Sequence, residues 1–283
     1  MWQEEVGAAL AAGFARLLGQ PDGVRRLGLT GSVASVPGTA AVLAAAVGDP
    51  RVFRAQRPTA RGQRADFTSA AARILAQRLD RMDLAEALAL ALAGEVRGAD
   101  GVADAWARDG HVLVSVTSAA LARVVEDLLD AHRDPGALDA STSVPVAPAR
   151  AAAARLAHAR ARNLTRAAHA HGVRPWSDGD ASRGAALTSL VDEPGARDLV
   201  LCLAGSRDAI ARAGEAHRPD PVIAHLDRTA AAHRAWFEMT RVTPRGAGAI
   251  TSAHRSRLCL NDAATPVLAG GLAILGLDAP EHL

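Results

Sequence analysis

Basic side chains gather in the segment 150–174, and their type and spacing favour binding of a polyanion. The segment contains six arginines, three histidines and no acidic residue. At about 100° per helical residue, five of these side chains fall within roughly 80° of one another, namely Arg155, His158, Arg162, Arg166 and His169. Leu156 and Leu164 point elsewhere, so we expect a helix with a basic stripe and an apolar face. A polyanion along the stripe would relieve like-charge repulsion and release counterions.

A second acid-free run of arginines lies in the first quarter of the chain and offers the same chemistry. Its members are Arg51, Arg54, Arg57, Arg61 and Arg64. The alternative for both runs is a solvated face. All 32 basic residues of this chain are arginine, and a genome-wide compositional bias explains that usage better than selection for arginine chemistry.

Other residue types that do chemistry are sparse, and the sequence predicts no catalytic residue, no metal site and no cofactor. The pairs His225–Asp227 and His169–His171 lack a third ligand at a recognisable spacing. The absence of lysine excludes a phosphate loop with its lysine and a Schiff-base lysine. We interpret Gly246-Ala247-Gly248 as a loop between helices.

Cysteine usage and the N-terminal residues predict a cytoplasmic protein. Cys202 and Cys259 are too few for a disulfide framework or a cysteine-rich zinc site, and we expect both to be reduced residues of the core. Acidic residues follow Met1 where a signal peptide carries basic ones. No apolar stretch approaches the 18 residues that would span a bilayer, so we expect no membrane association.

The elements that position the basic segment divide the chain into two domains. The run from His132 to Ala147 is rich in proline and small polar residues and is interpreted as a linker. Before it, the patterns predict helices over 4–18, 68–79, 83–93 and 118–131, and antiparallel strands over 101–107 and 111–117. After it, they predict helices over 148–170, 182–191, 195–213, 219–241 and 255–275.

The expected fold class is therefore mainly α. Residues 1–131 form a small α+β domain with a short antiparallel sheet, residues 132–147 form the linker, and residues 148–283 form an all-α helical bundle.

The second half also carries motifs whose order is informative. Ala157-His158-Ala159-Arg160 lies early in a long predicted helix, and Trp236-Phe237-Glu238-Met239-Thr240-Arg241-Val242 follows about 75 residues later. The sequence then runs through Val267-Leu268, Gly271-Leu272 and Leu275-Gly276 to Ala279-Pro280-Glu281. This arrangement resembles the DALR anticodon-binding domain of arginyl-tRNA synthetases over about residues 148–283.

The first half resembles the N-terminal additional domain of the same family. Asp66-Phe67-Thr68-Ser69 matches a turn that opens a helix, and Arg108 to Val114 takes the place of a strand of that domain. The resemblance implies contacts to the tRNA elbow, and the arginines between Arg51 and Arg64 are the candidates for them.

The catalytic domain of the family has no counterpart between these two regions. About fifteen residues of linker stand in its place, without an H-x-G-H motif or the lysine-containing signature loop. We therefore expect an arginyl-tRNA synthetase-like protein that is not an enzyme.

The resemblance also implies which residues contact tRNA. Arg155, His158, Arg162 and Arg166 are expected on phosphates, and Trp236 and Phe237 on an unpaired anticodon base, with Trp236 the more exposed of the two. Arg241 holds either the RNA loop backbone or the bundle. Arg160 is expected to point into the bundle, where a buried arginine needs a carboxylate partner.

Departures from the family pattern concern the same residues. The aromatic before the A-H-A-R motif is Leu156, and the residue before that is Arg155 instead of glutamine. Glu238 replaces an asparagine. His111 and Leu113 replace an aromatic and an asparagine in the N-terminal strand.

The resulting expectation is a non-catalytic tRNA-binding protein that recruits or holds a tRNA in trans, an arginine isoacceptor being favoured. It would serve a tRNA-dependent biosynthetic enzyme. Two alternatives remain open, namely a protein-interaction module that pairs with a synthetase and a transferase that uses aminoacyl-tRNA.

Overall fold

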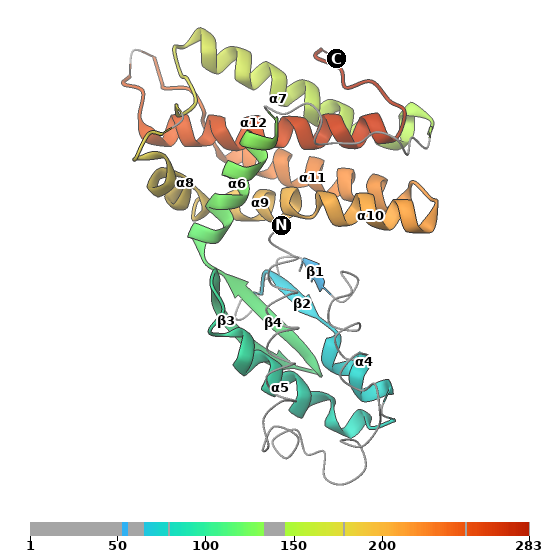
Figure 1. The fold of residues 1–283 in the computed structure, drawn as a ribbon. Coiled ribbons are helices and arrows are strands. Elements are labelled where there is room, and N and C mark those ends of the chain that lie inside the picture. The colour runs from blue at the N-terminus through green and yellow to red at the C-terminus, as the bar shows by residue number, and fades with distance from the viewer. Residues whose placement is uncertain are drawn as a thin grey trace. The chain divides into compact units, whose positions relative to one another are not determined.

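The computed structural model describes residues 53–55, 65–78, 80–132, 145–177, 179–246 and 248–282. Two compact units divide the chain, one ending at Thr117 and the other beginning at Ser118. The helix predicted over 4–18 and most of the predicted linker lie outside the described residues. The mainly α fold class is confirmed (Figure 1).

The first unit contains a four-stranded antiparallel sheet in the order β1-β2-β4-β3. Its strands are β1 (Phe53–Ala55), β2 (Phe67–Ser69), β3 (Val102–Arg108) and β4 (His111–Val116). Asp109 and Gly110 join β3 to β4 with φ angles of 54° and 71°, which is the backbone that a two-residue hairpin turn requires. The predicted hairpin is confirmed, with a register irregularity near Asp104.

Two helices cover this sheet, α4 (Ala71–Arg78) and α5 (Ala85–Val96), with a short 3₁₀ turn at Met82–Leu84 between them. Leu75, Leu88 and Leu92 are among the buried aliphatic side chains of these helices. The helix predicted over 68–79 begins later than expected because Phe67–Ser69 pairs as strand β2. Phe67 is itself buried there.

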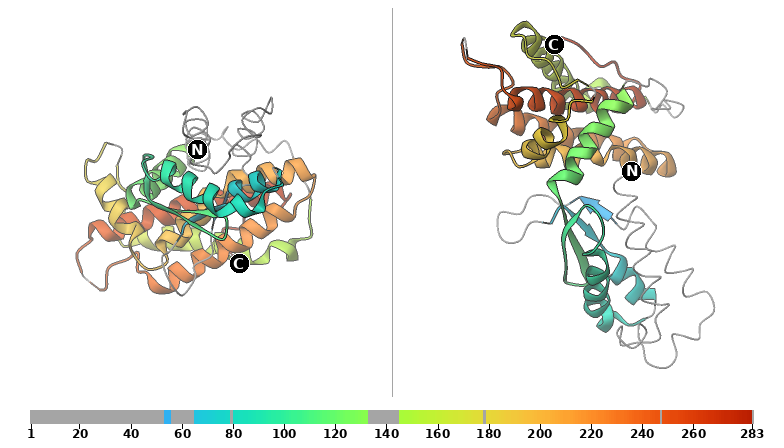
Figure 2. Two further views of the ribbon diagram at one scale, coloured as in Figure 1. Left: turned by 90° about the horizontal axis from the view of Figure 1, so that it is seen from below. Right: turned by 60° about the vertical axis from the view of Figure 1, so that its left-hand side comes forward.

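The second unit is an all-α bundle, as predicted. Its helices are α6 (Ser118–His132), α7 (Ala152–Ala170), α8 (Arg183–Val191), α9 (Ala196–Ala204), α10 (Ser206–Ala216), α11 (Asp220–Met239) and α12 (Ser252–Ile274), with a 3₁₀ turn at Pro148–Ala151 before α7. The predicted helix over 195–213 is two helices, because the chain breaks at Gly205. Helices α7, α11 and α12 pack on one another (Figures 1 and 2).

Helix α6 belongs to the bundle, although the sequence pattern places it in the N-terminal domain. It packs against α8, α9 and α12, and buries Leu121 and Val125 completely. Arg183 of α8 approaches Glu126 and Asp130 of α6, with nitrogen–oxygen distances of 3.6 and 3.8 Å. The boundary between the compact units therefore falls at residue 117 rather than at residue 131.

No helix in the described part of the chain is long and apolar enough to cross a membrane.

Candidate nucleic-acid interface

Helix α7 turns a stripe of alanines toward the core. Ala154, Ala157, Ala161 and Ala168 are buried, while Leu156 is 48% exposed. Leu156, which the sequence places on the apolar face of this helix, is therefore not part of the core. Small side chains let neighbouring helices approach closely, and the long arginine side chains then lie along the flank of the contact with their charged ends toward solvent.

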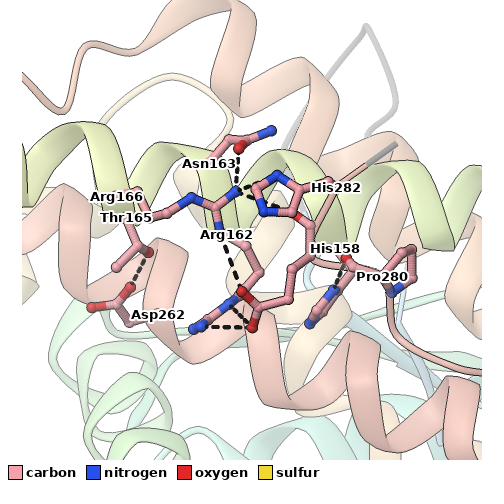
Figure 3. Close-up of polar contacts among 9 residues, drawn as sticks. His158, Arg162, Asn163, Thr165, Arg166, Asp262, Pro280 and His282 are labelled. Atoms are coloured by element: carbon pink, nitrogen blue, oxygen red, sulfur yellow. Dashed lines mark hydrogen bonds and ion pairs between the residues drawn. The ribbon is translucent and has the colours of Figure 1, made fainter.

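His158 is the first member of the basic stripe that the structure places differently from expectation. Its side chain is 4% exposed, and its Nδ1 donates a hydrogen bond of 2.8 Å to the carbonyl oxygen of Pro280 (Figure 3). His158 therefore fastens the segment after α12 to α7 and does not present its ring to a phosphate.

Arg162 and Arg166 lie on one flank of α7 and share a single carboxylate, that of Glu281. Arg162 Nη2 is 2.8 Å from Glu281 Oε1, and Arg166 Nη1 is 3.3 Å from Glu281 Oε2 (Figure 3). Arg166 also donates to the Glu281 carbonyl and to Asn163. The two guanidinium groups thus converge on one anion, an arrangement that also suits a phosphate.

Arg155 and Arg160 occupy the first half of α7, and both are half-buried. The guanidinium carbon of Arg160 lies 5.3 Å from the ring centroid of Phe237 on α11. The expected carboxylate partner of Arg160 is therefore replaced by a cation–π contact.

An open groove of about 460 Å³ runs between α7 and α11. Alanines of both helices line it together with the exposed Leu156, and charged residues stand among them, namely Arg160, Asp227, Arg234 and Glu238. Arg234 Nε and Glu238 Oε1 are 2.8 Å apart and form an exposed ion pair. The groove thus offers an apolar lining for a flat group and both signs of charge for its polar edges.

Trp236 and Phe237 differ in exposure in the sense opposite to expectation. Trp236 is completely buried, while Phe237 is half-buried beneath Arg160. A Cβ added at Gly195 would lie 3.1 Å from Trp236 Cα, so α11 is tightly enclosed there. Trp236 is therefore part of the core, and only Phe237 remains for contact with a ligand.

Arg241 is exposed just beyond the end of α11. Its carbonyl oxygen accepts a hydrogen bond of 3.0 Å from Arg257, and Arg257 also pairs with Glu193 at 2.8 Å. The backbone at Arg241 is therefore tied to α12 while its own side chain faces solvent.

A buried polar network that no sequence pattern indicated joins α7, α11 and α12. Asn261 donates to the Ala161 carbonyl and to Thr165 Oγ1, and accepts from His233 Nε2 at 3.1 Å. Thr165 in turn donates to Asp262 at 2.7 Å. Asn261 is one of only two asparagines in the chain, and this scarcity is the signal that would have found it.

Burial shifts the pKa of two histidines and one cysteine of the bundle away from neutral pH. Burial lowers the pKa of His225 and of His233 to about 4, and burial raises the pKa of Cys202 to about 11. Among the residues that the structure describes, no three potential ligands of these types or carboxylates gather as a metal site would require.

Four of the five arginines that are candidates for contact with the tRNA elbow cannot be placed. Arg54 lies in strand β1, and Arg51, Arg57, Arg61 and Arg64 lie outside the described residues.

Comparison with known proteins finds similarity in the second half of the chain. Residues 154–283 match the DALR anticodon binding domain. Arginine–tRNA ligase of Pseudarthrobacter chlorophenolicus is 40% identical over 127 residues, and that of Kineococcus radiotolerans is 38% identical over the same length. Each alignment covers 45% of this chain and 22% of the ligase.

The chain therefore spans only about a fifth of these relatives. Arginyl-tRNA synthetase of Thermus thermophilus superposes with 17% sequence identity and a TM-score of 0.37, over 99% of this chain and 59% of that one.

Proposed function

We propose that the bundle, whose residues 154–283 match the DALR anticodon binding domain, binds tRNA. The match to that family is the observation that carries this proposal. The groove between α7 and α11 and the arginines on the flank of α7 support it, because they combine an apolar lining with cations for a phosphate backbone.

In this proposal, the side chains of Arg155, Arg162 and Arg166 contact phosphates. Phe237, which packs against Arg160, lies beside an unpaired base. Contact with a base by stacking contributes about 1 to 3 kcal/mol. Arg241 contributes its side chain at the end of α11. His158 and Trp236 act indirectly, because both are buried and hold the surrounding helices in place.

We further propose that the chain binds its tRNA in trans in the cytoplasm, without ligase chemistry of its own. The family match covers residues 154–283, and the alignment with the Pseudarthrobacter chlorophenolicus ligase covers 45% of this chain and 22% of the ligase. The N-terminal unit acts as the elbow-binding additional domain, and residues 132–147 stand where the synthetases carry their catalytic domain. An arginine isoacceptor is the proposed cargo and a tRNA-dependent biosynthetic enzyme its recipient.

Direct binding of the purified protein to a panel of tRNAs at several salt concentrations tests this function. We expect sub-micromolar binding, preference for an arginine isoacceptor, and a steep decrease in affinity with salt. The Arg155→Ala/Arg162→Ala/Arg166→Ala variant should bind more weakly, with a salt slope shallower by about 0.7 to 0.9 for each phosphate that its arginines no longer neutralise.

The matched control removes three exposed arginines elsewhere on the bundle, Arg207, Arg218 and Arg228, and should change binding little. Equal losses of tRNA affinity in both variants would show that the loss depends on net charge and not on the position of the arginines. Wild-type binding no tighter than about 10⁻⁴ to 10⁻⁶ M, the range of non-specific binding to duplex DNA, would refute the proposed function. Delivery in trans additionally requires that the protein accelerate a tRNA-dependent enzyme.

Two observations favour a second candidate, a module that pairs with a synthetase. Glu281 already neutralises part of the charge of Arg162 and Arg166, and Asp227 and Glu238 place carboxylates along the groove. Co-purification of a synthetase in the absence of RNA would support this candidate over the first.

A further inference from the structure

Two acid-free segments far apart in the sequence meet at one end of the bundle. The first is the end of the basic segment, residues 169–177, and the second is residues 242–257, which contain arginines and histidine but no carboxylate. Trp176 Nε1 donates a hydrogen bond of 3.1 Å to Oγ of the buried Ser256, and a Cβ added at Gly172 would lie 3.6 Å from Ile250 Cδ1.

Carbonyl oxygens and an aromatic ring hold two arginines on this end of the bundle. Arg174 Nη1 donates to the carbonyl oxygens of His169 and Val173, at 2.7 and 3.0 Å. The guanidinium carbon of Arg255 lies 5.4 Å from the ring centroid of Trp176. Carbonyl and aromatic contacts orient a guanidinium group and leave its charge in place, whereas a carboxylate would cancel it.

Arg257 shows the contrast within the same stretch of chain. Its guanidinium forms two hydrogen bonds with the Glu193 carboxylate, at 2.8 and 3.0 Å. It therefore belongs to the framework of the bundle. Among the described residues, no carboxylate is paired with Arg174, Arg245 or Arg255, and His169 and His171 are exposed.

We infer that these residues form a second RNA-backbone surface, which continues the line of cations along α7 beyond the end of that helix. This distal basic surface consists of His169, His171, Arg174, Trp176, Arg245 and Arg255. The inference rests on the proposed function, since it extends the footprint of the same RNA.

The composition of the surface favours RNA over a protein partner. Of the exposed large hydrophobic residues in the described chain, Ile250 alone adjoins this surface, and it is 38% exposed. A protein interface is expected to have an apolar centre, whereas phosphate recognition needs oriented donors and positive charge. Arginine groups that retain their charge next to an aromatic ring fit the second description.

Position along α7 explains how one RNA reaches both surfaces. Arg162, Arg166 and His169 follow one another on the same flank of the helix, about 10 Å from first to last at 1.5 Å per residue. Arg174 follows directly and is hydrogen-bonded to the His169 carbonyl. A backbone that contacts Arg162 and Arg166 therefore meets further cations as it leaves the helix.

The test is the Arg174→Gln/Arg245→Gln/Arg255→Gln variant of the full chain, titrated with the preferred tRNA at several salt concentrations. We expect weaker binding and a salt slope that is shallower by about 2 to 3, close to one for each arginine removed from a phosphate. The order of preference among tRNAs should stay the same, because backbone contacts carry no sequence information.

Two controls keep the result interpretable. The Arg207→Gln/Arg218→Gln/Arg228→Gln variant loses the same charge from other exposed positions and should keep the wild-type slope. The second control is the single Arg245→Gln variant, because Arg245 does not pack on Trp176. A shallower salt slope of tRNA binding in this variant therefore does not depend on a loosened Trp176. Thermal unfolding of the triple variant shows whether Trp176 is loosened there.

The outcomes separate this inference from the proposed function. Wild-type tRNA binding with an unchanged slope in the triple variant would overturn the inference and leave the function standing. An RNA hairpin without an anticodon loop tests the opposite outcome, in which the distal basic surface binds RNA but the anticodon is not recognised. If the wild type binds that hairpin as tightly as tRNA, and the triple variant does not bind it, the surface is confirmed and anticodon recognition fails. Loss of a protein partner with RNA binding intact would also overturn the inference.

Discussion

The carboxylate of Glu281 determines how much positive charge the flank of α7 offers. It lies against both Arg162 and Arg166 (Figure 3), and its side chain is 54% exposed. Exposed ion pairs of this kind contribute about 0.2 to 1 kcal/mol. Such a weak contact holds the two arginines together in the free protein and is exchangeable for a phosphate.

Removal of this carboxylate should therefore strengthen RNA binding. We expect the Glu281→Gln variant to bind tRNA about 1.4- to 5-fold more tightly than the wild type, since the phosphate no longer displaces an ion pair of that strength. Measurement of the dissociation constant at low salt checks this.

Asp278→Asn is the matched control, because Asp278 is an exposed acid three residues earlier in the same segment. It should leave the affinity close to that of the wild type. A lower affinity of the Glu281→Gln variant would instead show that the carboxylate orients the arginines for RNA.

At the scale of elements, the close approach between helices depends on residues with a small side chain or none. Helix α7 contributes alanines, and α12 contributes Gly271, where an added Cβ would lie 2.7 Å from Leu226 Cδ2 of α11. Leu226 is completely buried, so it has little room to move. The contact between α11 and α12 is therefore intolerant of added side-chain volume at Gly271.

The Gly271→Ala substitution is expected to destabilise the bundle. Overpacking costs about 1 to 3 kcal/mol, which exceeds the roughly 1 kcal/mol that alanine contributes over glycine in a helix. Gly214 in α10 is the matched control, because no atom lies within 4 Å of a Cβ added there. Gly214→Ala should leave stability unchanged or raise it by up to about 1 kcal/mol. Denaturant unfolding of both variants checks the difference, and equal effects would contradict the packing argument.

At the scale of the molecule, the division of the chain does not follow its composition. The proline-rich run after α6 marks the domain boundary in the sequence, yet α6 packs with the bundle on the far side of that run. Its buried aliphatic side chains, among them Leu121 and Val125, complete the core formed with α8, α9 and α12.

A fragment that contains residues 118–283 is therefore expected to unfold as one cooperative unit, and a fragment of residues 133–283 to be less stable by several kcal/mol. Burial of a leucine or valine side chain contributes about 1.5 to 3 kcal/mol, and the shorter fragment lacks several of them. Circular dichroism during urea unfolding compares the two fragments. Equal midpoints would contradict the assignment of α6 to the bundle.

Much of the fold was predictable because it depends on local chemistry. Apolar periodicity placed the helices of the bundle, and β-rich alternation around Asp109-Gly110 placed the hairpin. The A-H-A-R helix and the motifs that follow it predicted the match of residues 154–283 to the DALR anticodon binding domain. These features could be predicted because each depends on the residues of one short segment. The break at Gly205 was missed because glycine alone does not end a helix.

The sequence by itself determined where the charge lies along the chain, and only the tertiary structure decided which charges face solvent. His158 meets the Pro280 carbonyl across 122 residues of sequence, and Trp236 is enclosed at Gly195. The meeting of Trp176 with Ser256 likewise joins two basic segments that no local pattern connects. Helical periodicity gives the direction of a side chain on its own helix, but its burial depends on which distant segment packs there.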